Sequence, residues 1–342
     1  MNSNPISRRG ALALGGGALA TGLTGIGGLA PSAWAQSAQP AYPTKPITIV
    51  VGYPPGGQTD FGGRMLTAGL QNALGQSVVI DNRAGVGGNI GADYVMKAPP
   101  DGYRLLAGNG AMCINPHTYR NTVMVDPLKF TPIGLMLESA LVLVVPSSMP
   151  VHTFGEYVSW IKAQEKTRGG VDYASSAAGS LTHVTMELMR DRIGKPTMTH
   201  VAYKGSGPAI IDVIAGRVSG LFDAASVVSP FVKSGQLRPL MVTSAKRVPS
   251  LPDVPTATEL GLKDFEILAF IGLYGPPGLP APIVEKLNAA LNTSLKDPSL
   301  VKTIADRGES PGGGTPERLK KMTTDDFNRW RDIVKENDIR AE

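Results

Sequence analysis

Short runs of β-branched and apolar residues alternate along the chain with longer segments in which apolar residues recur at helical spacing. The first run spans residues 47–51, and a mostly apolar segment of helix length, 61–74, follows it. Strands that alternate with helices pair in parallel through right-handed crossovers, so the pattern predicts an α/β fold. Comparable strand-like runs lie at 77–80, 103–107, 171–174, 200–203, 218–222 and 240–243.

Two stretches are strand-like over a greater length and divide the pattern into parts. Residues 130–146 contain two strand-like runs, the second of which could carry the chain from one domain to the next, and 265–274 could carry it back. A chain of 342 residues is long enough for two α/β domains with separate cores. Three helices are predicted at the end, and apolar spacing in the last one is typical of core contacts. They span 283–296, 298–307 and 316–336.

The loop after the first strand combines glycine and proline with polar residues. Residues 52–57 are Gly-Tyr-Pro-Pro-Gly-Gly, which ends a strand, and Gln58 then leads into a helix with Thr59 or Asp60 as the N-cap. Backbone N–H groups at such a helix N-terminus suit an anion. The loop is not a Walker phosphate loop, because no Gly-Lys-Ser/Thr follows. A plain strand-to-helix turn is the alternative, and repetition of the arrangement along the chain favours a binding loop.

Small-residue loops also follow later strands. The segment 81–91 resembles a dinucleotide fingerprint but has Ile90 where a third glycine is needed. It is therefore either a second glycine loop at a cleft or a tight turn that brings helix and strand together. Asn109 lies between two glycines after the third strand, and the loop 175–180 carries several hydroxyls before a helix. Ligands of parallel sheets bind outside the carboxyl ends of the strands, so the first three loops are predicted to converge.

The sequence contains no convincing catalytic or metal-binding set. It has no Gly-x-Ser-x-Gly elbow, and its four histidines lack the spacing of metal ligands. The single cysteine, Cys113, excludes an internal disulfide and is predicted to be a buried small hydrophobe. His183, on the first turn of a helix, is interpreted as a surface residue or a local hydrogen-bond partner. We therefore expect no enzyme activity, cofactor or metal, and a hydrolase that uses Ser180 and His183 is the alternative.

The first 35 residues have the features of a secretory signal. Arg8 and Arg9 precede an uncharged segment, 10–30, and Ala33-Trp34-Ala35 is a small-x-small cleavage site. The paired arginines and the glycine-rich core favour the twin-arginine route, and an uncleaved membrane anchor is the alternative. The net charge of +5 is scattered without a run of Lys or Arg, so no nucleic acid partner is expected. These features predict an exported, periplasmic protein that captures a small anion.

A series of short motifs occurs in one order from Tyr42 nearly to the C-terminus. The motifs are Tyr42-Pro43, Lys45-Pro46-Ile47, Pro55-Gly56-Gly57 with Asp60, Leu74-Gly75-Gln76, Asn82-Arg83-Ala84-Gly85 with Gly87-Gly88, Pro100-Asp101-Gly102-Tyr103, Asn115-Pro116, Tyr203-Lys204-Gly205, Val242-Thr243-Ser244, Pro252-Asp253-Val254-Pro255-Thr256 and Leu287-Asn288. Through them the chain resembles the extracytoplasmic solute receptors of tripartite tricarboxylate transporters, also called the Bordetella uptake gene type. Each motif is weak alone, and their shared order makes the resemblance specific.

This resemblance implies a type II periplasmic-binding-protein fold, with two α/β domains joined by two crossover strands and a ligand cleft between them. The first domain would span 42–138 plus 265–342, and the second 139–264. Carboxylates would be held mainly by backbone N–H groups, hydroxyls and water, with the loops 53–60 and 175–180 facing each other. The residues expected to bind the ligand are Tyr53, Gly57, Gln58, Thr59, Asp60, Asn109, Ser176, Ala178, Gly179, Ser180, His183, Tyr203, Lys204 and Asp223.

The implied function is that of a periplasmic solute-binding receptor. It would capture a small organic carboxylate and deliver it, as a monomer, to the membrane permease of a tripartite tricarboxylate-type transporter. A ligand-dependent sensor partner with the same fold is one alternative, and a secreted serine hydrolase is another. Two positions depart from the family pattern. Tyr53-Pro54 replaces the usual Phe and variable residue, which could change the pocket wall, and Ser219 stands where an acidic residue is expected.

Overall fold

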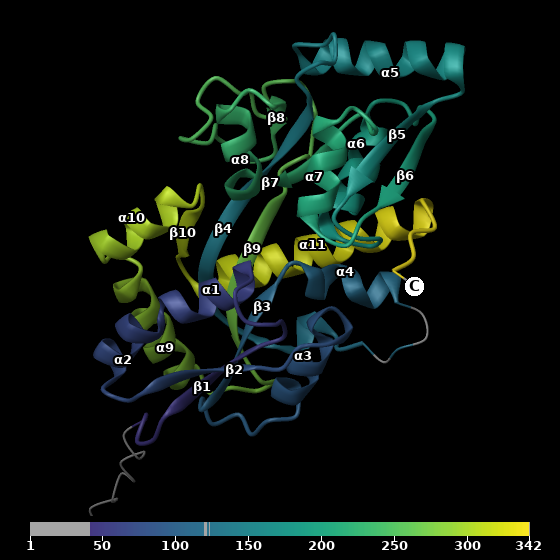
Figure 1. Cartoon of the computed structure of the whole chain (residues 1–342). Helices are drawn as coiled ribbons and strands as arrows, with labels where there is room; N and C mark the ends of the chain where they lie inside the picture. Colours follow the sequence, from purple (N-terminus) through teal and green to yellow (C-terminus); the bar gives the residue numbers. More distant parts are fainter. Residues whose placement is uncertain (1–41, 120–121, 123, 342) are drawn as a thin grey trace, which may run out of the picture. The chain divides into compact units, whose positions relative to one another are not determined.

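A single long strand, β4, connects two parts of the main sheet (Figure 1). The computed structural model describes residues 42–119, 122 and 124–341, so the predicted leader lies outside the described residues. The first half of β4 pairs antiparallel with β9 and β10, the second half pairs antiparallel with β7 and β8, and the change of partners falls between Ala140 and Leu141. Residues 130–146, predicted as two runs, thus form one strand. The bounds are β4 (Thr131–Pro146), β7 (Leu221–Ala224), β8 (Leu237–Val242), β9 (Leu268–Gly275) and β10 (Ser310–Gly313).

Three parallel strands continue the sheet beyond β9. The order is β10-β4-β9-β3-β1-β2, and β1 pairs in parallel with both of its neighbours. The predicted α/β pattern is confirmed here, while β3 is antiparallel to β9. The strand β10 was not predicted, because Ser-Pro-Gly-Gly has no apolar run. The bounds are β1 (Ile47–Val51), β2 (Val78–Asn82) and β3 (Arg104–Asn109).

Helices cover both faces of this sheet because successive strand side chains point in opposite directions. Ile49 of β1 belongs to a buried cluster with Leu70 and Leu287, whereas its neighbour Val50 belongs to a second cluster with Trp330. The predicted helix 61–74 begins earlier and is divided at the fully buried Leu66. The bounds are α1 (Gln58–Met65), α2 (Thr67–Leu74), η1 (Val86–Gly88), α3 (Asn89–Met96), α4 (Ala111–Thr118), η2 (Pro127–Lys129), α9 (Ala281–Ser294), α10 (Pro298–Asp306) and α11 (Pro316–Glu336).

A two-stranded parallel sheet lies beside β7. The backbone N–H of Ala174 donates to Gly220 O at 3.0 Å, and that of Ser219 donates to Asp172 O at 2.8 Å. These bonds join β5 to the start of β7. The carboxyl ends of β5, β6 and β7 therefore lie at the same edge. The buried Ser219 hydroxyl lies 3.1 Å from the Tyr157 hydroxyl and donates to Asp172 O at 2.7 Å. The bounds are β5 (Val171–Ser175), β6 (Met198–Ala202), α5 (Phe154–Arg168), α6 (Leu181–Arg192), α7 (Ser206–Ile214) and α8 (Ala225–Lys233).

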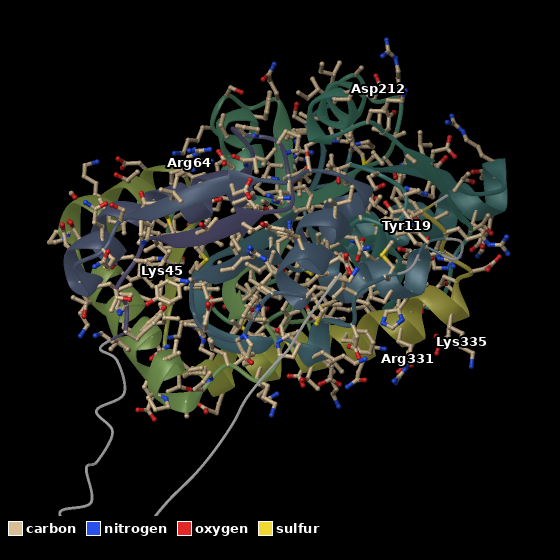
Figure 2. All side chains as sticks on the ribbon, turned by 90° about the horizontal axis from the view of Figure 1, so that it is seen from below. Lys45, Arg64, Tyr119, Asp212, Arg331 and Lys335 are labelled. Atoms are coloured by element: carbon tan, nitrogen blue, oxygen red, sulfur yellow. The ribbon has the colours of Figure 1, made fainter. Side chains whose placement is uncertain are left out.

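The last helix, α11, packs its apolar face into the core, as its spacing predicts. Leu319 and Trp330 are fully buried, while Arg331 and Lys335 point outward (Figure 2). Cys113 is also fully buried, and its thiol contacts Thr323 O of α11, which confirms it as a small core residue. None of the helices in the described ranges is both long enough and apolar enough to cross a membrane.

The contact between α11 and β9 yields a stability prediction. Leu319 packs so closely on Gly272 of β9 that an ideal Cβ there would lie 2.6 Å from Leu319 Cδ1. We expect Leu319→Ala to leave a cavity and lower the free energy of unfolding by about 2–5 kcal/mol, measured by urea denaturation. The exposed neighbour Lys320 supplies the control, since Lys320→Ala should change the free energy of unfolding by less than about 0.5 kcal/mol. Equal effects of the two substitutions would contradict this packing.

Candidate functional site

The three loops at the carboxyl ends of β1, β2 and β3 converge, as predicted. Gly52, after β1, lies against Gly88, and an ideal Cβ on Gly52 would be only 2.6 Å from Gly88 O. Gly91 approaches Gly52 equally closely, with its ideal Cβ 2.9 Å from Gly52 Cα. Only glycine fits such distances, because the backbones themselves are in contact. The glycines of 81–91 therefore act as a tight turn that lets the loops meet.

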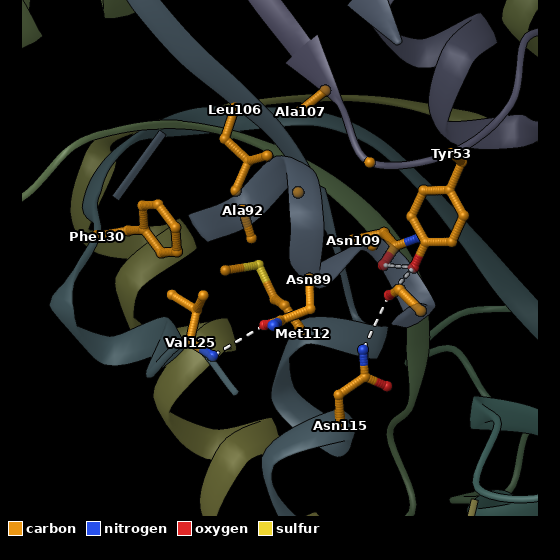
Figure 3. Close-up of a pocket in the computed structure, with 14 residues that line it drawn as sticks. Tyr53, Asn89, Ala92, Leu106, Ala107, Asn109, Met112, Asn115, Val125 and Phe130 are labelled. Carbon is orange, nitrogen blue, oxygen red and sulfur yellow. Dashed lines mark hydrogen bonds between the residues drawn. The ribbon is translucent and has the colours of Figure 1, made fainter. Parts of the chain in front are cut away.

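Side-chain hydrogen bonds tie these loops together. The Tyr53 hydroxyl lies 2.8 Å from Gly87 O and 3.2 Å from Asn109 Oδ1, and the two side chains meet in Figure 3. Asn109 Nδ2 donates to Thr59 Oγ1 at 3.0 Å. The cavity beside Tyr53 measures about 20 Å³, which is room for water but not for an organic acid. Tyr53, Thr59 and Asn109 thus hold the loops in place through bonds to one another.

Asp60 is a fixed anion inside the first turn of α1. Burial would raise its pKa, but hydrogen bonds from Arg64, the Gly56 N–H and Asn82 outweigh burial and lower the pKa to about 2. Arg64 itself lies at the surface (Figure 2). The predicted N-cap, Thr59 or Asp60, is wrong, because Gly57 already has the extended N-cap conformation and the helix begins at Gln58. Asp60 instead bonds backward to the Gly56 N–H at 2.9 Å.

The Gln58 side chain is bound to a residue that the sequence did not single out. Gln58 Nε2 donates to Glu309 Oε1 at 2.8 Å, and the Glu309 side chain is fully buried. Ser226, in the first turn of α8, lies 3.5 Å from the same oxygen. Arg307 pairs with the other carboxylate oxygen at 3.4 Å. Glu309 therefore connects the first turn of α1 to the first turn of α8, over a separation of 251 residues from Gln58.

The loop between β5 and α6 has its hydroxyls bound to one another. Ser180 is the N-cap of α6, and its Oγ accepts from the His183 N–H at 3.4 Å. Thr182 Oγ1 accepts from the Ser176 N–H at 3.0 Å and also contacts both serine hydroxyls. Sequence reasoning missed Thr182, although a hydroxyl on the first turn of the helix was a visible signal. At the tip, Ala177 is exposed and Ala178 is half-buried.

The neighbouring loop after β6 is fastened to this one. The Gly205 N–H donates to Ser176 O at 2.7 Å. Tyr203 points away, because its hydroxyl donates to Asp212 at 2.7 Å, and Lys204 is exposed. Asp223, at the end of β7, accepts from the Ala224 N–H at 2.8 Å and from Ser206, while its other carboxylate oxygen is buried without a partner in the described part of the chain. Burial raises the pKa of Asp223 to about 6.

Gly179 and His183 lie beneath the loop. Gly179 is buried against Thr118 of α4 and Ala341, and its φ is +69°. His183 Nδ1 accepts from the Gly179 N–H at 3.1 Å, so this residue is a local hydrogen-bond partner, one of its two predicted interpretations, but not a surface residue. Its ring stacks on His200 at a centroid distance of 3.5 Å.

The geometry offers little support for the hydrolase alternative. Ser180 Oγ contacts the backbone N–H of His183, whereas the His183 Nδ1 atom is occupied by the Gly179 N–H. Ser175 Oγ does lie 2.6 Å from His200 Nε2, but Ser175 is fully buried, so a substrate carbonyl cannot reach it. The described residues also contain no group of three or more His, Cys, Asp or Glu placed to hold a metal ion.

The predicted ligand residues therefore fall into two groups. Tyr53, Gly57, Gln58, Thr59, Asp60 and Asn109 surround the first turn of α1, and Ser176, Ala178, Gly179, Ser180 and His183 surround that of α6. Tyr203, Lys204 and Asp223 border the second group. That the two groups face each other across a ligand stays a prediction.

Comparison with known proteins places the chain among transport receptors. The model of the family described as tripartite tricarboxylate transporter family receptor matches residues 63–339. Protein BugT of Bordetella pertussis is 34% identical over 300 residues, covering 86% of this chain and 90% of BugT. The structural neighbours have the fold of periplasmic binding proteins, so the predicted fold class is confirmed.

Two similar structures were determined with an organic acid. Rpa4515 of R. palustris with adipate is 34% identical, with a TM-score of 0.71, and the match covers 87% of this chain and 99% of that one. MatC of Rhodopseudomonas palustris with bound malate is 30% identical, with a TM-score of 0.68, and the match covers 86% of this chain and 100% of that one.

Two of the buried aspartates, Asp60 and Asp223, predict opposite pH dependences. Asp60, whose pKa falls to about 2 in the folded state, stabilises the fold above pH 4 and loses that contribution as the pH falls toward 2. We expect Asp60→Asn to lower the unfolding free energy at pH 7 by on the order of 2 kcal/mol, with no difference near pH 2.

Asp223 supplies the matched control for this measurement. Burial raises its pKa to about 6, so the wild type loses stability as the pH rises from about 4 through 6, and the unfolding free energy of Asp223→Asn relative to wild type should increase from pH 4 to pH 7. Urea denaturation at several pH values measures both variants. If the stability of the two variants relative to wild type changed with the same sign between low pH and pH 7, the assigned environments would be contradicted.

Proposed function

This chain belongs to the tripartite tricarboxylate transporter family of receptors, and from that membership we propose that it captures a small dicarboxylate in the periplasm and delivers it to a membrane permease of that transporter type. Adipate and malate, the acids named for the two solved relatives, each have two anionic ends. Two helix N-termini, those of α1 and α6, offer one binding position for each end.

The observation that carries this proposal is the uncapped N-terminus of α1. The first N–H groups of a helix have no helical acceptors, and no described side chain caps them here. An ideal Cβ on Gly57 would meet no described atom within 4 Å. Because Gln58, Thr59 and Asp60 direct their side chains to other partners, their backbone N–H groups are left for a ligand.

The loop at α6 supplies the second position. Its three hydroxyl-bearing residues, Ser176, Ser180 and Thr182, are engaged with one another, so they shape the loop more than they contact a ligand. Ala177 and Ala178 stand at the tip, and we assign the second carboxylate to their N–H groups. Recognition by backbone donors needs no cationic clamp, so ligand size and shape would decide affinity.

We further propose that two domains, 42–138 plus 265–342 and 139–264, close around the ligand. The change of partners along β4 at Ala140 and Leu141 supports a boundary there. The contacts from Glu309 to Gln58 and Ser226 would form in the closed state, since they join the first turns of α1 and α8. In this proposal the receptor acts as a monomer, and residues 1–35 direct its export through the twin-arginine route.

Gly57 offers a direct test of the binding site. Its φ of −78° suits any residue and its surroundings are open, so Gly57→Leu should fold normally while its side chain covers the N–H groups. We expect a loss of affinity for adipate or malate of tenfold or more, with an unchanged melting temperature. Calorimetric titration measures the affinity after unfolding and refolding have removed any ligand carried through purification.

The control is Gly155→Leu, at an exposed and equally open glycine in the first turn of α5. It should bind the acids as the wild type does. Gly179 is unsuitable for this test, because its positive φ and its contacts with Thr118 and Ala341 would disturb the fold. Wild-type affinity in Gly57→Leu would exclude this site, and the absence of binding by the wild type to any member of a dicarboxylate panel would overturn the proposed function.

A further inference from the structure

Three aromatic rings from three different elements form a buried stack beneath the loop 175–180. Tyr173 of β5 and His200 of β6 lie with ring centroids 5.2 Å apart and 30° between their planes. His200 and His183 of α6 are closer, at 3.5 Å and 13°. Tyr173 is fully buried and His183 nearly so, so neither ring offers its face to a ligand in the cleft.

Hydrogen bonds from the two histidines reach the loop backbone at two points. His183 Nδ1 accepts from the Gly179 N–H at 3.1 Å, so this nitrogen carries no proton. Ser175 Oγ lies 2.9 Å from Ala177 O and donates its single proton there. His200 Nε2, at 2.6 Å from the same Oγ, must then be the donor to Ser175. The network thus assigns His183 as the Nε2–H tautomer and requires a proton on His200 Nε2.

These two points lie on either side of Ala178. His183 holds the Gly179 N–H directly, and His200 acts through Ser175 on the Ala177 carbonyl, which also accepts from Ser180 Oγ at 2.7 Å. Together the two histidines set the direction of the peptide groups at the tip of the loop. We propose that His183 and His200 are positioning residues, which hold the loop 175–180 in the geometry that binds a carboxylate. This inference deepens the proposed function and rests on it.

The charge state of the stack follows from the groups around it. The Tyr173 hydroxyl donates to Glu187 of α6, whose other oxygen pairs with Arg190 at 2.8 Å, so this carboxylate is already balanced. From α4, the neutral Thr118 packs against Gly179. Burial, followed by repulsion from His200, lowers the pKa of His183 to about 3, and burial lowers that of His200 to about 4. Both rings are therefore neutral at pH 7, as the bond to Gly179 demands.

A pair of substitutions separates the hydrogen bond from simple packing. His183→Leu fills similar space without an acceptor, whereas the side-chain oxygen of His183→Asn can replace Nδ1 as the acceptor for Gly179. We expect the affinity for a dicarboxylate such as adipate to fall about tenfold in His183→Leu and to recover to within about threefold of wild type in His183→Asn. The exposed His152→Leu should have no effect. Equal loss in both His183 variants, or none in either, would overturn the inference.

Nuclear magnetic resonance tests the same inference without a ligand. The ¹⁵N shifts of the imidazoles should show the Nε2–H tautomer for His183 at pH 7, and the Gly179 amide should exchange with solvent at least tenfold faster in His183→Leu than in His183→Asn. An Nδ1–H tautomer in His183, or equal exchange in both variants, would refute the positioning role. Because neither readout needs binding, failure of the inference and failure of the proposed function can be told apart.

Discussion

In the proposed site, each loop must keep its own polar side chains paired so that a few backbone N–H groups remain for a ligand. At α1, Asn109 engages Thr59 and Glu309 engages Gln58, while Asp60 bonds to Arg64 and Asn82. At α6 the hydroxyls bond to one another and His183 takes up the Gly179 N–H. An unpaired side chain in either loop would compete with a carboxylate for the same donors. The dense hydrogen bonding around the loops is therefore part of the proposed binding site.

The long strand β4 places these loops relative to the rest of the fold. Its first half belongs to the same sheet as β9, β3, β1 and β2, and β1, β2 and β3 end at the converging loops beside the first turn of α1. Its second half pairs with β7. Because β7 lies beside β5, this half is near the loop 175–180, which follows β5. In the proposed closure, a small change in the twist of β4, which both parts share, would alter the distance between the two helix N-termini. Such a change would also alter the contacts of Glu309 with Gln58 and Ser226.

Local chemistry in the sequence was enough to predict most of the strands, the glycine loops and several helix starts, although not the strand β10 or the start of α1. Those features depend on residues close in sequence, such as Pro298, which begins α10 directly after its N-cap Asp297. Long-range pairs could not be predicted. Glu309 has no motif that links it to Gln58, and the stack of His183 on His200 depends on the parallel register that sets Tyr173 beside His200. Such contacts are fixed by tertiary packing, which one sequence does not encode in a readable pattern.

The central claim is that backbone donors at two helix N-termini hold the two ends of a dicarboxylate. A crystal structure of the protein purified without denaturation, or soaked with adipate, tests it most directly. Our account predicts one carboxylate within hydrogen-bond distance of the N–H groups of Gly57, Gln58 or Thr59, and the other at Ala177 and Ala178. A ligand held chiefly by charged side chains such as Lys204, or bound away from both loops, would contradict the account.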